Sequence, residues 1–85
     1  MPKITIWTKD YCPYCKRAKA LLDSLNYKYV EMDITNTPEK IEELKKLSNA
    51  LTVPQIFVDG KFIGGCTDIE KLHEEGKLQD ILNGK

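Results

Sequence analysis

The sequence predicts one α/β domain, residues 1–85, in which a βαβ unit is followed by a ββα unit. Three observations predict this order of elements. Alternating apolar residues at 3–8 are followed directly by apolar residues at helical spacing, β-favouring segments recur at 28–33 and 55–58, and Asp59-Gly60 is a strong hairpin signal. A chain of 85 residues can bury one modest core, so we expect no second domain.

The first unit is expected to contain two strands, at residues 3–8 and 28–33, joined by a helix at 13–25. Asn26 should end that helix. The apolar side chains of the helix fall on one stripe that can face the sheet. They are Ala18, Leu21, Leu22 and Leu25. A strand, a helix and a second strand in this order predict a βαβ unit with parallel strands.

A second helix is predicted between the two units. It should begin with Thr37 as its N-cap and Pro38 in its first turn, because proline suits the first helical position. Its inward residues should be apolar at helical spacing, namely Ile41, Leu44 and Leu47. Ser48-Asn49 should end it, since Asn tolerates the left-handed conformation.

The second unit is predicted from its turn. Segments 55–58 and 61–64 flank Asp59-Gly60, so they should form antiparallel neighbouring strands. Residues 67–70 have the spacing of a capping box, which predicts a third helix beginning with Thr67 as its cap and ending near residue 75. Gly76 should break this helix before a short helical turn at 78–82.

Charge and composition exclude several classes of function. Thirteen basic and thirteen acidic side chains give zero formal net charge, so nothing favours binding to nucleic acid or to a membrane surface. No apolar run approaches the roughly 18 residues of a membrane span, and residues 1–4 do not resemble a secretory signal. Three cysteines, two of them in one motif, fit reduced or cycling thiols. We expect a cytoplasmic protein that acts as a monomer.

Cys12-Pro13-Tyr14-Cys15 is the most informative segment, because two thiols at this spacing can cycle between dithiol and disulfide. Cys12 should precede the helix, where the dipole and the unpaired N–H groups favour a thiolate, so we expect Cys12 to attack disulfides. Cys15 falls on the buried stripe and is expected to be the resolving thiol. Nearby basic residues indicate a local anion site, namely Lys9, Lys16, Arg17 and Lys19.

A structural zinc site is the alternative interpretation of paired cysteines. A closed zinc site takes four ligands, and beyond the pair only Cys66 and His73 are available. We therefore expect no bound metal, and we interpret His73 as a surface residue. Cys66 keeps two interpretations, an inert residue packed beneath the glycine turn or a regulatory thiol open to oxidation or glutathionylation.

These motifs resemble those of the glutaredoxin family, in particular its small dithiol members. Cys12-Pro13-Tyr14-Cys15, Thr52-Val53-Pro54 and Gly64-Gly65-Cys66-Thr67-Asp68 occur in the family's order, and the resemblance covers essentially the whole chain. It implies a thioredoxin-like fold with a four-stranded mixed sheet, order 2-1-3-4, flanked by three main helices. It also implies glutathione as co-substrate and no tightly bound cofactor.

The resemblance further implies a glutathione-binding site. Pro54 would follow a cis bond and the Val53 backbone would pair with the cysteinyl part of glutathione, whereas the residues alone equally allow an ordinary proline at a strand start. The γ-glutamyl carboxylate would bind N–H groups at the start of the third helix, and Asp68 would receive the ammonium group. The implied contacts are Lys9, Tyr14, Thr52, Val53, Pro54, Gly65, Thr67 and Asp68.

The glycyl end of the implied site departs from the family pattern. Lys9 matches the family's basic residue for the glycyl carboxylate, although a lysine at this position is also compatible with a solvated surface charge. Many members carry Gln or Arg where this chain has Ala50, so one polar contact is missing. A charge-assisted hydrogen bond contributes roughly 1.5 to 3 kcal/mol. We expect weaker glutathione binding unless Lys9 or Gln55 compensates.

The implied reaction is glutathione-dependent reduction of protein–glutathione mixed disulfides and of protein disulfides, the second requiring both Cys12 and Cys15. The implied partners are glutathione, glutathionylated proteins and protein disulfides, with ribonucleotide reductase as a candidate. Two alternatives stay open. An iron–sulfur carrier would bridge two chains through Cys12 and glutathione, which Pro13 argues against. A redoxin served by a thioredoxin-type reductase would have no use for the site at Thr67 and Asp68.

Overall fold

The central sheet of the computed structural model has the strand order that the resemblance implies. The structure describes residues 3–48 and 53–83. The strands lie in the order β2-β1-β3-β4, with β1 parallel to β2, and with β3 antiparallel to both β1 and β4. They are β1 Ile4–Thr8, β2 Val30–Asp33, β3 Gln55–Val58 and β4 Lys61–Gly64. The predicted mixed α/β sheet is confirmed.

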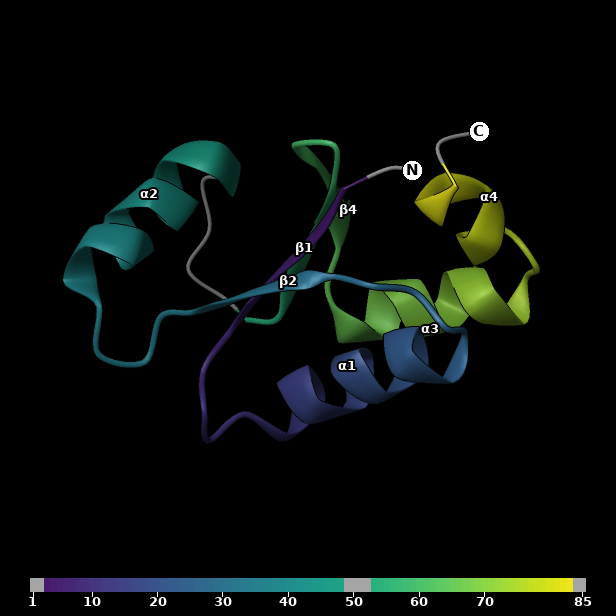
Figure 1. Cartoon of the computed structure of the whole chain (residues 1–85), viewed down its shortest axis with the longest axis horizontal. Helices are drawn as coiled ribbons and strands as arrows, with labels where there is room; N and C mark the ends of the chain where they lie inside the picture. The colour runs from purple at the N-terminus through teal and green to yellow at the C-terminus, as the bar shows by residue number, and fades with distance from the viewer. Residues whose placement is uncertain (1–2, 49–52, 84–85) are drawn as a thin grey trace.

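Helices cover both faces of this sheet (Figure 1). They are α1 Pro13–Ser24, α2 Pro38–Ser48, α3 Cys66–Glu74 and α4 Leu78–Leu82. Helices α1, α3 and α4 lie on one side of the sheet and α2 lies on the other. Three helices are long and α4 has five residues, as predicted. Among residues 3–48 and 53–83, no helix is both long enough and apolar enough to cross a membrane.

Each face of the sheet has its own hydrophobic core. Alternation along β1 sends Ile6 to one face and Trp7 to the other. The larger core packs strand residues against α1, α3 and α4, and its buried members are Ile4, Ile6, Ala18, Leu22, Ile56, Val58, Cys66, Ile69, Leu78 and Leu82. The smaller core lies under α2 and contains Trp7, Ile34, Leu44 and Phe57. Helix α1, which carries the cysteine pair, is therefore anchored by the larger core.

The two predicted chain reversals are present. Asp59 and Gly60 have φ angles of 52° and 84°, the left-handed values that a two-residue hairpin turn of this type requires, and strands β3 and β4 have the predicted bounds. Asn26 has a φ of 62° just after the C-cap Leu25 of α1, so it provides the predicted left-handed stop. Asn49, the predicted stop of α2, lies outside the described residues.

Strand β1 begins one residue later and helix α1 ends one residue earlier than predicted, and two other predicted starts are wrong by two residues. Strand β2 begins at Val30 and not at residue 28, because in the parallel register with Val30 opposite Thr5, residue 28 would lie opposite Lys3, before β1 begins. Helix α3 begins at Cys66 with Gly65 as its N-cap, so Thr67 is not the cap. The acidic partner expected in a capping box is Asp68, whose Oδ2 accepts a hydrogen bond from the Gly65 N–H at 2.9 Å.

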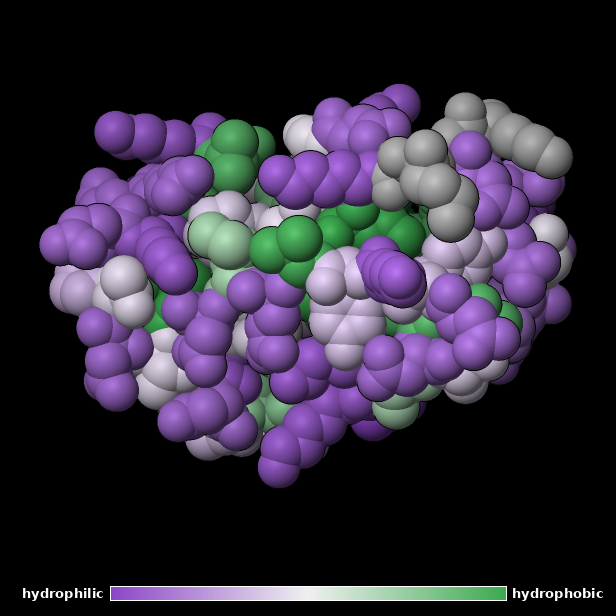
Figure 2. Space-filling model, viewed as in Figure 1, coloured by the Kyte–Doolittle hydropathy of each residue, from purple (hydrophilic) through white to green (hydrophobic). Residues whose placement is uncertain are grey.

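Hydrophilic side chains cover most of the face shown in Figure 2. A narrow apolar strip crosses the middle of this face, where Figure 1 draws the edge strand β2. Val30 on β2 has 46% of its surface exposed. The strand is only four residues long and carries the exposed carboxylates of Glu31 and Asp33, and both features oppose pairing with another chain.

Candidate active site

The cysteine pair occupies the N-terminus of α1. Cys12 is the N-cap residue, with extended backbone angles, and Pro13 is the first helical residue. The backbone N–H of Cys15 donates to Sγ of Cys12 at 3.3 Å. An N-cap side chain normally offers an oxygen to the unpaired N–H groups of the first turn. Here the acceptor is a sulfur atom, so the end of the helix directs a donor and the positive end of its dipole at Cys12.

The two thiols lie in different environments. Cys12 retains 9% of its surface exposed and Cys15 only 1%, in agreement with the stripe that places Cys15 against the core. Burial raises the pKa of Cys15 to about 12, and its hydrogen-bonding and charge interactions with Cys12 act in the same direction. Cys15 is therefore a protonated thiol at neutral pH.

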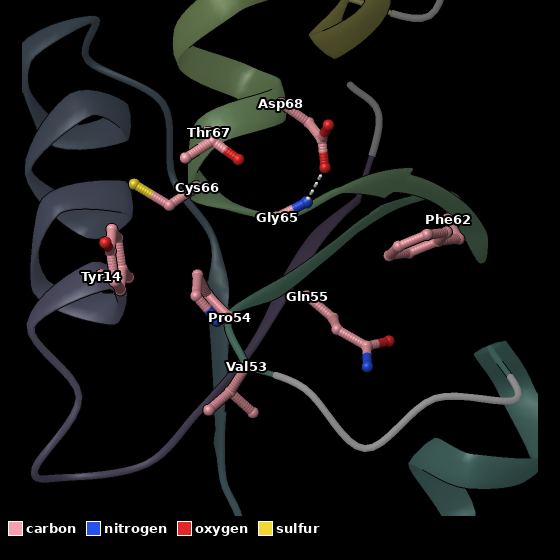
Figure 3. A pocket seen from close by; sticks show the side chains of 9 residues that line it. All are labelled: Tyr14, Val53, Pro54, Gln55, Phe62, Gly65, Cys66, Thr67 and Asp68. Carbon is pink, nitrogen blue, oxygen red and sulfur yellow. Dashed lines mark hydrogen bonds between the residues drawn. The ribbon is translucent and has the colours of Figure 1, made fainter.

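A cavity of about 340 Å³ opens beside this pair (Figure 3). Tyr14 of α1 forms one wall and the first turn of α3 forms the other. Val53 and Pro54 lie between these walls, and the bond that joins them is cis, as the resemblance implies. The Cys12 thiol donates to the Val53 carbonyl at 3.8 Å, which brings this segment next to the cysteine pair. The lining residues are Tyr14, Val53, Pro54, Gln55, Phe62, Gly65, Cys66, Thr67 and Asp68.

The α3 side of the cavity depends on two glycines. Gly64 has a φ of 136°, and a Cβ built there would lie 2.5 Å from Cβ of Asp68. A Cβ on Gly65 would lie 3.0 Å from the Pro54 carbonyl oxygen. The glycines therefore let the end of β4 pass close to both Pro54 and Asp68. Asp68 stays exposed, with one carboxylate oxygen bonded to the Gly65 N–H.

Comparison with known proteins identifies the family. The family model described as Glutaredoxin matches residues 4–63, which is most of the chain. This chain is a member of the glutaredoxin family. Glutaredoxin 3 of Escherichia coli strain K12 is 46% identical over 82 residues, covering 96% of this chain and 99% of that protein. Glutaredoxin 1 of Rickettsia prowazekii is 44% identical, covering 93% of this chain and 85% of that protein.

Solved glutaredoxin structures agree with the fold. A buckwheat glutaredoxin–glutathione complex superimposes with a TM-score of 0.84 at 32% identity, over 96% of this chain and 77% of that chain. A solution structure of glutaredoxin from Brucella melitensis gives a TM-score of 0.83 at 43% identity, over 96% and 89% of the two chains. The thioredoxin-like fold of the glutaredoxins is thereby confirmed, and membership of the family implies thiol–disulfide oxidoreductase activity.

The structure brings most of the implied glutaredoxin site residues together. Six of them line the cavity, namely Tyr14, Val53, Pro54, Gly65, Thr67 and Asp68. Lys9 is not among the lining residues, and its ammonium group lies 5.9 Å from the ring centroid of Tyr11. The backbone carbonyl of Lys9 accepts from the Cys12 N–H at 3.3 Å, so Lys9 belongs to the loop that carries the attacking thiol. Thr52 and Ala50 lie outside the described residues.

The basic residues near the pair do not form the single anion site that their clustering predicts. Arg17 is paired with Glu70 of α3 at 2.8 Å, and Lys19 is paired with Glu31 of β2 at 3.0 Å. Within the part of the chain that the structure describes, no ion pair is found for Lys9 or Lys16. Arg17 and Lys19 are therefore held in ion pairs with Glu70 and Glu31, while the charge of Lys19 still acts to lower the pKa of Cys15.

Sequence reasoning missed one lining residue and left another open. Phe62 of β4 lines the cavity with 47% of its surface exposed, and its ring lies 5.4 Å from that of Phe57. The available signal was the aromatic residue placed across the hairpin from Phe57. Cys66 also lines the cavity, and burial raises the pKa of its thiol. A buried, protonated thiol favours the inert interpretation of Cys66.

Proposed function

We propose that this glutaredoxin is a glutathione-dependent thiol–disulfide oxidoreductase that reduces protein–glutathione mixed disulfides and protein disulfides through Cys12 and Cys15. The observation that carries the proposal is the cavity beside the pair, bounded by an aromatic side chain and by the N-terminus of α3. The buckwheat relative solved as a glutaredoxin–glutathione complex supports glutathione as the ligand.

The cavity offers complementary groups to the γ-glutamyl and cysteinyl parts of glutathione. Backbone N–H groups in the first turn of α3 suit the γ-glutamyl carboxylate, because they have no partner within the helix. Asp68 suits the γ-glutamyl ammonium, since its carboxylate is exposed at the same place. The Val53 backbone lies beside Cys12, where the cysteinyl part must sit for its sulfur to meet the attacking thiol.

The glycyl end of glutathione is assigned to the loop before α1. In this proposal Lys9 carries the charge for the glycyl carboxylate, and Tyr14, which lines the cavity from α1, flanks the mixed disulfide. A lysine ammonium group is a point charge on a flexible stem, so it can leave the ring of Tyr11 when an anion arrives. Thr52 completes the proposed set of contacts.

The monothiol reaction needs only Cys12. Its thiolate attacks the glutathione sulfur of the mixed disulfide, a bond forms between these two sulfurs, and the protein thiolate leaves and takes up a proton. The thiolate of a second glutathione then attacks the glutathione sulfur bound to Cys12. Glutathione disulfide leaves, and the Cys12 thiolate is restored. The N–H of Cys15, which donates to Sγ of Cys12, stabilises the anion that leaves in this second step.

The dithiol reaction also uses Cys15. Cys12 first forms a mixed disulfide with one sulfur of a protein disulfide, and the thiolate of Cys15 then attacks Sγ of Cys12 and releases the second protein thiol. In the free enzyme, interactions with Cys12 contribute to the raised pKa of Cys15. They end when Cys12 is bound in the mixed disulfide, so the pKa of Cys15 falls at the stage when its thiolate is needed.

Protein substrates and location are part of the proposal. A reducing compartment such as the cytoplasm is proposed because three cysteines, two of them in one motif, fit reduced or cycling thiols. We propose that the protein acts as a monomer. Glutathionylated proteins, protein disulfides and ribonucleotide reductase are the proposed protein substrates, the last on family resemblance alone.

The decisive experiment is a coupled assay with glutathione, glutathione reductase and NADPH, applied to the wild type, Cys12→Ser and Cys15→Ser. With a glutathionylated peptide we expect turnover to be lost in Cys12→Ser and kept in Cys15→Ser. With a protein disulfide we expect both variants to lose turnover. Two results would contradict the proposal. One is a wild-type protein that is reduced by a thioredoxin-type reductase but not by glutathione. The other is a purified protein whose visible spectrum shows an iron–sulfur cluster and which has no thiol exchange activity.

A further inference from the structure

Arg17 links two side chains that belong to opposite sides of the cavity. Its Nη2 atom donates to both carboxylate oxygens of Glu70 at 2.8 Å, and the hydrogen bond to Glu70 raises the pKa of Arg17. Its guanidinium carbon lies 5.4 Å from the ring centroid of Tyr14, within the range of a cation–π contact. Tyr14, Arg17 and Glu70 therefore form a continuous chain of contacts.

The helical positions explain why these three side chains meet. Tyr14 and Arg17 are three residues apart on α1, so they are neighbours on its surface. Glu70 follows Cys66 by one turn of α3, and Cys66 lines the cavity. The contacts thus join the helix whose Tyr14 forms one wall of the cavity to the helix whose first turn forms the other wall.

Tyr14 needs such support because little else fixes it. Tyr14 is 51% exposed and its side chain lines the cavity, where an unsupported aromatic side chain is free to change rotamer. Ordering a mobile side chain on binding costs conformational entropy, which weakens binding. A ring that is already held in place when the substrate arrives avoids most of that cost.

We propose that Arg17 and Glu70 are positioning residues, which hold the Tyr14 ring against the cavity and thereby favour binding of the glutathionyl group of the substrate. The proposal rests on the proposed function, since it assigns a specificity role within the same site. Arg17 is held by Glu70 and lies over the ring of Tyr14. The pair therefore contributes to substrate binding through Tyr14, without acting on the sulfur atoms that react.

The test uses conservative variants in the coupled assay with a glutathionylated peptide. Glu70→Gln removes the charge that holds Arg17, and Arg17→Lys keeps a positive charge but loses the planar group that stacks on Tyr14. We expect each to raise KM about 2- to 5-fold, the size of one exposed cation–π contact, with kcat little changed. Glu74→Gln is the matched control, because it removes the same charge one turn further along α3, where no ion pair is described.

A double-mutant comparison separates positioning from a general effect on the fold. In a Tyr14→Leu background, Glu70→Gln should leave KM where Tyr14→Leu puts it, because the ring that Arg17 supports is gone. An unchanged KM in both single variants overturns the inference, as does an equal rise in KM with and without Tyr14. A wild-type protein without glutathione-dependent turnover would contradict the proposed function itself, before any variant is compared. Thermal unfolding of each variant shows whether a changed KM merely follows lost stability.

Discussion

At the scale of single residues, the site depends on two cysteines that differ in environment despite being three positions apart. Cys12 precedes α1 and its sulfur accepts a hydrogen bond from an N–H of the first turn, whereas Cys15 is buried within α1. Burial keeps Cys15 protonated, and a thiol reacts through its thiolate. The different roles proposed for the attacking and the resolving thiol therefore follow from their positions before and within the first turn of α1.

Alkylation should reveal this difference directly. In the reduced protein at about pH 7, iodoacetamide should modify Cys12 first, while Cys15 and Cys66 resist because burial raises the pKa of both thiols. The pKa of Cys15 is about 12. Its labelling rate should therefore rise about tenfold for each pH unit below that value, as the thiolate fraction grows. Mass spectrometry of digested samples gives the site of labelling, with urea-unfolded protein as the control in which all three cysteines react.

Equal labelling of Cys12 and Cys15 in the folded protein would contradict this account of the pair. A Cys12→Ser variant adds a second test. Burial remains in that variant but the interactions with Cys12 are lost, so Cys15 should label faster than in the wild type while still lagging behind the unfolded protein.

At the scale of elements, the junction between β4 and α3 builds one wall of the cavity. Gly64 takes a left-handed conformation close to Asp68, Gly65 caps α3, and Asp68 accepts the N–H of Gly65. Short-range chemistry explains this junction, yet the capping box was assigned two residues too late from the sequence. Glycine has no side chain to mark it as a cap, whereas Thr67 is a typical capping residue. Local patterns therefore located the helix but not its first residue.

Gly64→Ala should damage this junction more than a comparable change elsewhere. A positive φ costs a non-glycine residue roughly 1 to 3 kcal/mol, and contact with Asp68 should add roughly 1 to 3 kcal/mol of crowding. Gly76→Ala is the control, because Gly76 has a φ of 73° but open space around a Cβ. Urea unfolding measures the loss of unfolding free energy in each variant. The coupled assay should show a raised KM only for Gly64→Ala. Equal destabilisation by the two substitutions would show that Asp68 yields to the new methyl group without cost.

Other parts of the site could not be predicted from the sequence because they depend on long-range contacts. The hairpin from β3 to β4 was predicted to the residue, since Asp59-Gly60 specifies its turn locally. Arg17 and Glu70 are 53 positions apart, so the basic cluster could not show that Arg17 is neutralised. The position of Phe62 across the hairpin from Phe57 could be predicted in the same local way, but its place on the cavity wall also requires α3 and the segment before β3 to pack beside it. The cis bond before Pro54 was predicted only from the family resemblance, because the local residues are compatible with either isomer.

At the scale of the whole molecule, the two faces of the sheet carry unequal cores. Helix α1 buries Cys15, Ala18 and Leu22, whereas α2 buries Leu44 alone among its described residues. The larger core also holds α3 and α4, so the cysteine pair and the α3 wall of the cavity are attached to one cooperative unit. Helix α2 is attached through fewer buried apolar side chains, which predicts lower local stability.

Hydrogen exchange should show this asymmetry. Under native conditions the amides of α2 should exchange faster than those of α1, because a helix with one buried side chain opens at lower cost. Leu44→Ala should lower the free energy of unfolding by about 2 to 5 kcal/mol and increase the difference in exchange rate between α2 and α1. Leu22→Ala, in the larger core, should instead accelerate exchange in α1 and α3 together. Equal protection of α1 and α2 in the wild type would contradict a division of stability between the two faces.

The central position of β1 also determines when the site can exist during synthesis. Its Ile4 pairs with Val58, and the cavity draws on residues from Tyr14 to Asp68. A ribosome releases the N-terminal end of a chain first, so both thiols of the pair emerge long before the strand that completes the sheet and the helix that closes the cavity. The nascent chain thus carries its reactive chemistry before it has any surface that selects a partner.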